Sequence, residues 1–174
     1  DLRRSRGLGD VYKRQDKVIG MIVTDDFDTS VLTISKYGMA KRSRLGSGEM
    51  LPLTEAGTPI VDESGDQIFE RDGYRKTNRG TKGVRTMSLR DGDEIVSVRQ
   101  IPDLDDQLFM LTGSGMMIRM VSGQTKETLG KVTKGTRIME LRNRDRTGYE
   151  DEIVFVARLP SELISTGETL EEEE

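Results

Sequence analysis

The chain has 174 residues, of which 33% are hydrophobic, 33% are charged and only 5% are aromatic, and its formal net charge is −4. It contains no cysteine and no histidine, which excludes disulfides, thiolate or imidazole metal sites, and catalysis by a cysteine nucleophile or a histidine base. No apolar run approaches the roughly 20 residues that a membrane-spanning helix needs. We therefore expect a soluble, cytoplasmic protein with a lean hydrophobic core.

The first 15 residues fit no pattern found in the rest of the chain, and they carry five basic side chains without periodicity. Residues 10–15 (DVYKRQ) can be back-translated as a string that resembles a transposon end used to prepare sequencing libraries. We interpret residues 1–15 as a non-native read-through segment and leave them out of the fold prediction. The alternative is a genuine basic arm.

One segment occurs twice in the rest of the chain, at an offset of 77 residues. Residues 16–23 (DKVIGMIV) and 31–42 (VLTISKYGMAKR) correspond to residues 93–100 and 108–119. A third copy of the opening part begins at Asp151. Repetition of this kind indicates a tandem array of one supersecondary unit.

Each unit predicts four strands joined by short turns that contain glycine. The opening runs are apolar and β-branched, as in strands buried on both faces, and the third strands end on Arg42 and Arg119. The predicted strands cover residues 18–23, 31–35, 39–42 and 83–89 in the first unit, and 95–98, 108–112, 116–119 and 135–141 in the second. The pattern favours an all-β fold of antiparallel four-stranded blades in a β-pinwheel or propeller-like array, incomplete at about two blades plus the start of a third.

The spacing also predicts the organisation of the chain. The fourth strands repeat at an offset of 52 rather than 77, so the first unit carries about 25 extra residues. These form an insertion, a surface loop or flap, at about residues 45–78. The predicted segments are blade unit one at 16–92, blade unit two at 93–150, a closing strand of the next unit at 151–160, and an acidic tail at 161–174 that we expect to be disordered.

Two basic segments with glycines occupy corresponding places in the two units. Residues 78–85 read NRGTKGVR, and residues 130–137 read GKVTKGTR. Glycine lets the backbone approach a partner closely, while arginine and lysine supply charge. Neither segment is a Walker phosphate loop, because both lead into a strand and lack the Gly-Lys-Ser/Thr ending. Two such segments on one rim would suit a long polyanion, whereas solvated basic turns are the alternative.

Acidic side chains cluster in equivalent turns, at Asp25, Asp26 and Asp28 and again at Asp103, Asp105 and Asp106. Such clusters can bind a divalent cation. Solvated acidic hairpins are the preferred interpretation, and no metal site is predicted.

These motifs together resemble the C-terminal domain of the DNA gyrase A protein, a family of type IIA topoisomerase domains. The opening K-x-I-G-M, the turn YGMAKR and RGTKGVR carry the resemblance, and Arg79, Gly80, Lys82 and Gly83 match the family's gyrase box in four of seven positions. The resemblance implies a six-bladed β-pinwheel whose basic rim wraps DNA. By analogy, the residues that contact DNA phosphates would be Arg42, Arg79, Gly80, Lys82, Gly83, Arg85, Arg119, Lys131, Lys134 and Arg137.

The resemblance further implies a part of an enzyme. The intact enzyme would be a heterotetramer in which two gyrase A chains assemble with gyrase B chains, and it would supercoil double-stranded DNA negatively in an ATP-dependent reaction. Its Mg²⁺ and ATP would bind to other domains and to gyrase B, so we expect no cofactor in this chain. The family's catalytic tyrosine lies in an N-terminal core, so the chain would not be catalytic alone. The alternatives are the corresponding A chain of topoisomerase IV and, from another class, a protein-interaction propeller that does not bind DNA.

Overall fold

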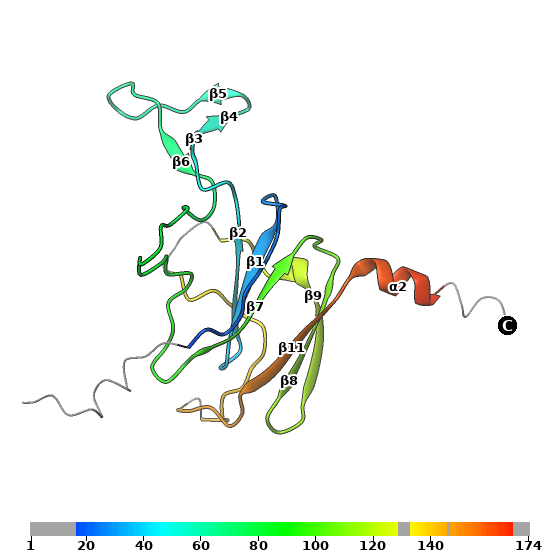
Figure 1. Cartoon of the computed structure of the whole chain (residues 1–174). Helices are drawn as coiled ribbons and strands as arrows, with labels where there is room; N and C mark the ends of the chain where they lie inside the picture. The colour runs from blue at the N-terminus through cyan, green and yellow to red at the C-terminus, as the bar shows by residue number, and fades with distance from the viewer. Residues whose placement is uncertain (1–16, 129–132, 146, 169–174) are drawn as a thin grey trace, which may run out of the picture.

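A computed structural model describes residues 17–128, 133–145 and 147–168, and these form almost only β-structure (Figure 1). The strands are β1 (Ser30–Ser35), β2 (Met39–Arg44), β3 (Met50–Pro52), β4 (Thr54–Glu55), β5 (Thr58–Pro59), β6 (Phe69–Arg71), β7 (Ile95–Ile101), β8 (Gln107–Thr112), β9 (Met117–Val121), β10 (Thr136–Arg137) and β11 (Ile153–Leu159). A short 3₁₀ helix, η1, spans Ser122–Gln124, and α2 spans Ser161–Glu168. No helix within these ranges is long and apolar enough to cross a membrane.

Two antiparallel sheets form the body of the molecule. The first has the strand order β10-β2-β1-β7, and the second has the order β11-β8-β9. In each sheet a hairpin supplies two strands, β1 with β2 and β8 with β9, as the repeat predicts. Gly38 and Gly115 close these hairpins at positive φ angles of +78° and +89°, a backbone region that glycine adopts without a steric penalty. The all-β, antiparallel fold is therefore confirmed.

The remaining strands come from the following repeat. The opening strand of the second unit, β7, pairs with β1 of the first unit, and β11 pairs with β8 in the same way. The fourth-strand segment of the second unit, β10, pairs with β2. The first sheet therefore combines a hairpin from one unit with two strands from the next unit. Figure 1 shows one of these, β7, beside β1.

An aspartate stabilises each pairing of an opening strand with the hairpin of the preceding unit. Oδ1 of Asp93, just before β7, accepts hydrogen bonds from the backbone N–H groups of Tyr37 and Glu94 at 3.1 and 3.0 Å. Oδ1 of Asp151, just before β11, accepts from Ser114 and Glu152 at 3.1 and 2.8 Å. Each carboxylate thus joins the start of an opening strand to the hairpin turn of the preceding unit.

The prediction of a buried opening strand at residues 18–23 is wrong for the first unit. These residues form no strand, and Val18 and Met21 are 92% and 84% exposed. The equivalent strands β7 and β11 pair with the hairpin of the unit before their own, and the described residues contain no earlier hairpin. The same reason accounts for residues 83–89, where the fourth strand was expected and none forms.

The insertion is structured. Residues 45–78 contain β3 paired with β6 and β4 paired with β5, and this arm projects away from the two sheets (Figure 1). Its base is held by Asp72, whose Oδ2 accepts the backbone N–H of Ser47 at 2.8 Å and whose Oδ1 pairs with Arg44 at 2.7 Å. The pKa of Asp72 is lowered by the Ser47 N–H and by the Arg44 guanidinium.

The hydrophobic core lies where the two sheets face each other. Its buried members include Leu32, Ile34, Leu108, Met110 and Ile153, each at most 1% exposed. Burying side chains of this size stabilises the fold by about 1.5–3 kcal/mol each. The core therefore joins residues from both units and from the strand that follows them.

The expectation of disorder from residue 161 onward is wrong for residues 161–168, which form α2. The backbone N–H of Ser161 donates to Asp106 at 3.0 Å, and its hydroxyl donates to Asp103 at 2.7 Å. Carboxylates that accept hydrogen bonds at the first turn favour a helix. The rest of the predicted tail and the predicted read-through segment lie outside the described residues.

Candidate nucleic-acid interface

The first basic segment, residues 78–85, is an open turn on the surface. Gly80 and Gly83 have φ angles of +78° and +75°, and a Cβ at either position would meet no atom within 4 Å. The turn is closed by the Thr81 hydroxyl, which donates to the carbonyl of Asn78 at 3.0 Å. The glycines therefore permit the left-handed backbone and leave space in which a ligand's backbone could approach.

The cations of this segment point to solvent. Arg79, Lys82 and Arg85 are exposed, and within the described part of the chain none of their side chains forms an ion pair or a hydrogen bond. Unpaired cations keep their full charge for an external anion and lose no internal partner when they bind it.

The second basic segment is described from residue 133 onward, so Lys131 lies outside the described residues. Lys134 is exposed, and Arg137 on β10 is exposed and paired with Glu140. Gly135, at a φ angle of +75°, passes so close to the carbonyl group of Ala40 that a Cβ would collide with it. This close contact seats the segment against β2.

A backbone hydrogen bond links the residues just after the first basic segment to the second basic segment. The backbone N–H of Ser88 donates to the carbonyl of Thr133 at 3.0 Å. Met87, between Ser88 and the cations, is only 4% exposed and anchors the first segment to the body of the protein. This backbone hydrogen bond connects the stretch that follows Arg85 with the residue that precedes Lys134.

Arg42 and Arg119 occupy the same repeat position but lie in different surroundings. Arg119 on β9 is exposed, donates from Nε to Oε1 of Gln107, and lies 5.7 Å from the centre of the Phe109 ring. Arg42 is 9% exposed. Its Nε donates to the Thr125 carbonyl at 2.8 Å, and its Nη1 donates to Ser30 Oγ and Glu127 Oε2 at 3.1 and 3.0 Å. The Arg42 guanidinium is thus buried and bound within the protein, whereas the other arginines predicted to contact DNA are exposed.

The acidic clusters have structural partners. Asp106 is 1% exposed and pairs with Arg158 at 2.6 Å, and Asp28 pairs with Arg44 at 2.7 Å. Within the described ranges no group of three or more carboxylates is placed to hold a metal ion. Asp106 is more than a solvated turn residue, because it ties the hairpin before β8 to β11 and α2.

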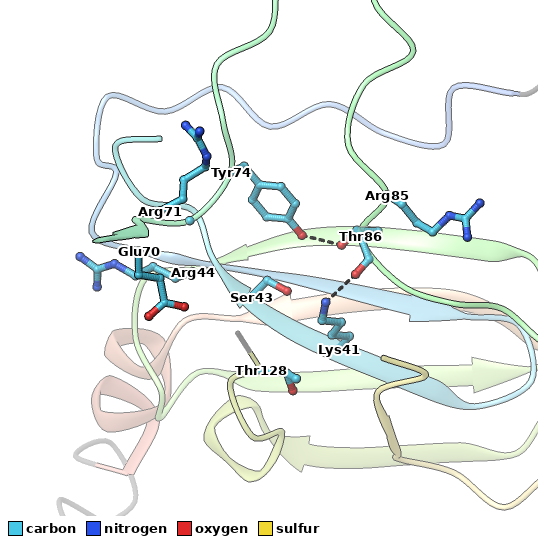
Figure 2. Close-up of a pocket in the computed structure, with 10 residues that line it drawn as sticks. Lys41, Ser43, Arg44, Glu70, Arg71, Tyr74, Arg85, Thr86 and Thr128 are labelled. Carbon is cyan, nitrogen blue, oxygen red and sulfur yellow. Dashed lines mark hydrogen bonds between the residues drawn. The ribbon is translucent and has the colours of Figure 1, made fainter. Parts of the chain in front are cut away.

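Sequence reasoning missed a polar pocket beneath the first basic segment. Figure 2 shows Lys41 on β2 donating from Nζ to the Thr86 carbonyl, at 2.6 Å, with Tyr74 on the other side of Thr86. The signal was available in the repeat, because the position of Lys41 is occupied by Ile118 in the second unit.

Comparison with known families identifies one that part of the chain resembles. A model described as "DNA gyrase C-terminal domain, beta-propeller" matches residues 68–102 and 106–147, which include both basic segments. Over these residues the chain is similar to the DNA gyrase C-terminal domain family.

Curated relatives of the chain come from several bacteria. The DNA gyrase A protein of Campylobacter jejuni is 28% identical over 163 residues, covering 92% of this chain and 15% of the relative. The DNA gyrase A protein of Metamycoplasma arthritidis is 33% identical over 100 residues, which cover 58% of this chain and 10% of the relative. The chain thus spans about 15% or less of the length of these relatives.

Two C-terminal domains are among the solved structures that match the chain. The C-terminal domain of DNA topoisomerase IV matches with a TM-score of 0.43 at 19% identity, over 84% of this chain and 52% of the other. The DNA gyrase A C-terminal domain matches with a TM-score of 0.39 at 22% identity, over 76% and 51%.

Proposed function

We propose that the chain is the DNA-binding and DNA-wrapping part of a gyrase A protein. The observation that carries the proposal is the match to the gyrase C-terminal domain family across both basic segments. The exposed, unpaired cations of residues 78–85 support it, because they can neutralise phosphates without first breaking a protein contact.

The proposed contacts position DNA without reading its sequence. Arginine and lysine bound to phosphate fix the path of the duplex, whereas sequence is read through base edges. Bending 20–30 base pairs costs of the order of 1–6 kcal/mol, so a row of cations has to offset that cost. We assign this role to six cations that are exposed on the described surface: Arg79, Lys82, Arg85, Arg119, Lys134 and Arg137.

The rest of the reaction would lie outside this chain. The complete enzyme would act in the bacterial cytoplasm as a heterotetramer of two gyrase A chains with gyrase B chains, and would couple ATP hydrolysis to negative supercoiling. Mg²⁺ and ATP would bind to its other domains and to gyrase B. This chain would contribute the surface around which DNA is wrapped, and it would contribute no catalytic group.

The test is the salt dependence of binding to a duplex of 30–40 base pairs, measured by fluorescence anisotropy. If each of the six exposed cations neutralises one phosphate, log K should fall against log salt with a slope of about −5. The double variant Arg79→Ala/Lys82→Ala should reduce the magnitude of that slope by about 2. A variant with the same loss of charge outside the basic segments, Lys17→Ala/Arg144→Ala, is the matched control and should retain the wild-type slope. Binding that does not respond to salt, or equal slopes for the two double variants, would contradict the proposal.

A further inference from the structure

A polar pocket lies on the face of β2 that the insertion covers. Its volume is about 100 Å³, and it is assembled from β2, from the base of the insertion, and from the segment that follows the first basic turn (Figure 2). The lining residues are Lys41, Ser43, Arg44, Glu70, Arg71, Gly73, Tyr74, Arg85, Thr86 and Thr128.

The wall of this pocket is polar where the repeat calls for a hydrophobic core. Thr33, Lys41 and Ser43 share one face of the β1–β2 hairpin, since Thr33 pairs with Lys41 in register. The corresponding residues of the second unit, 77 positions later, are Met110, Ile118 and Met120, which belong to the core or pack against it.

The substitution of polar for apolar residues at these positions is costly to folding. Lys41 and Ser43 are 2% and 7% exposed, and burying a charge or a hydroxyl disfavours the folded state unless partners compensate. Burial also lowers the pKa of Lys41. Departures from a local packing rule concentrate at functional sites.

The groups in the pocket suit an oxyanion. Ser43 Oγ is buried and has no hydrogen-bond partner among the residues that the structure describes. The Tyr74 and Thr86 hydroxyls lie 2.5 Å apart, and Thr86 Oγ1 lies 3.4 Å from that of Thr33. Hydroxyl groups can rotate to donate to an incoming oxygen, so a ligand oxygen could satisfy the buried serine that the protein leaves unsatisfied.

The side chains around the pocket carry mainly positive charge, which suits an oxyanion. Beside Lys41, the lining holds three arginines and one acid, Glu70. Arg44 is paired with Asp72 and Asp28, and Arg71 donates to the carbonyl of Gly48 at 2.7 Å. Arg85 forms no such contact within the described residues. Positive charge therefore exceeds negative charge around the cavity.

We propose that this pocket binds a phosphoryl group, with Lys41 supplying the buried charge and the Ser43 hydroxyl a hydrogen bond at its wall. The four oxygens of a phosphate can accept from an ammonium group and several hydroxyls at once. The group could be free inorganic phosphate or a phosphate of a nucleic-acid backbone. Lys41 and Ser43 do not belong to the proposed DNA surface, whereas Arg85 belongs to that surface and also lines the pocket.

The first test titrates inorganic phosphate into the 174-residue chain by calorimetry, at constant ionic strength held with sodium chloride. Saturable binding that chloride does not reproduce is expected. Lys41→Met, which restores the apolar character of the repeat, should weaken phosphate binding at least tenfold, and Ser43→Ala should weaken it several-fold. Lys17→Ala is the matched control, an exposed lysine outside both the pocket and the basic segments, and should bind phosphate like the wild type. Circular dichroism verifies folding, and Ser43→Ala decides the matter should Lys41→Met fail to fold.

Absence of phosphate binding, or equal affinity in the wild type, Lys41→Met and Ser43→Ala, would overturn the proposal. A duplex-binding assay on the same variants separates the two sources. A backbone phosphate is the ligand if Lys41→Met weakens DNA binding and inorganic phosphate competes with the duplex. Free phosphate is the ligand if Lys41→Met loses phosphate but binds DNA as before. Loss of DNA binding in Arg79→Ala/Lys82→Ala with phosphate binding retained would support both sites independently.

Discussion

Replacing Arg42 by methionine distinguishes a structural arginine from one that binds DNA. The change keeps most of the length of the side chain and removes the three hydrogen bonds to Thr125, Ser30 and Glu127. Arg119→Met is the control at the equivalent repeat position, where the guanidinium is exposed.

The magnitude follows from how deeply the ion pair is buried. The Arg42 side chain is 10% exposed and that of Glu127 is 32% exposed. Breaking a fully buried pair costs about 3–5 kcal/mol. Here the freed carboxylate is partly hydrated and keeps its 2.8 Å bond from Ser30, so we expect a loss of about 2–3 kcal/mol in the free energy of unfolding. Arg119→Met should change stability by no more than about 0.5 kcal/mol.

The assay combines urea unfolding with the salt titration of duplex binding. Arg42→Met should lower the urea midpoint and leave the salt slope unchanged under conditions where the protein is folded. Arg119→Met should leave the urea midpoint nearly unchanged and should make the salt slope smaller in magnitude by about 0.9. The reasoning is refuted if Arg42→Met is as stable as the wild type, or if it reduces the salt slope as much as Arg119→Met does.

Two further predictions concern the hairpin turns within the units and the carboxylate of Asp151, which bonds to one of them. The hydroxyl of Ser114 and the backbone N–H groups around Asp151 lower the pKa of its carboxyl from 3.8 to about 2; this contribution to stability is present above pH 4 and is lost as the pH falls towards 2. Asp151→Asn should therefore reduce the fall of the urea midpoint between pH 4 and pH 2, and an unchanged pH profile would contradict this. Gly38 and Gly115 both have positive φ, but a Cβ at Gly38 would collide with the carbonyl of Met139, whereas Gly115 faces open space. Gly115→Ala should cost about 1–2 kcal/mol and Gly38→Ala clearly more in thermal unfolding, and equal costs would show that the contact relaxes freely.

The hairpins could be predicted from the sequence because their information is local. The β1–β2 and β8–β9 pairs each consist of two apolar runs around a glycine turn, and such a pattern determines its own partner. The opening strands carry an equally clear apolar pattern, but that pattern does not specify which hairpin receives them. β7 joins the preceding unit, and residues 18–23 remain exposed for the same reason.

In the candidate site, too, the features set by neighbouring residues could be predicted, whereas those set by distant residues could not. The exposure of Arg79 and Lys82 could be expected from the glycines beside them, which favour a turn. The burial of Arg42 could not, because Thr125 and Glu127 are more than 80 residues away in the sequence and belong to the other unit. Comparing Lys41 with Ile118 in the repeat would have indicated the polar pocket, although not that Tyr74 from the insertion covers it.

The pairing of strands from one unit with the hairpin of the preceding unit also determines how the protein can unfold. Cutting the chain between the two units would take β7 and β10, two of the four strands, from the first sheet. Neither sheet corresponds to one contiguous stretch of chain, so a unit cannot unfold without opening its neighbour. Nearest-neighbour coupling of this kind spreads a local defect along an array. Even a substitution far from the basic segments can therefore alter the surface on which they lie.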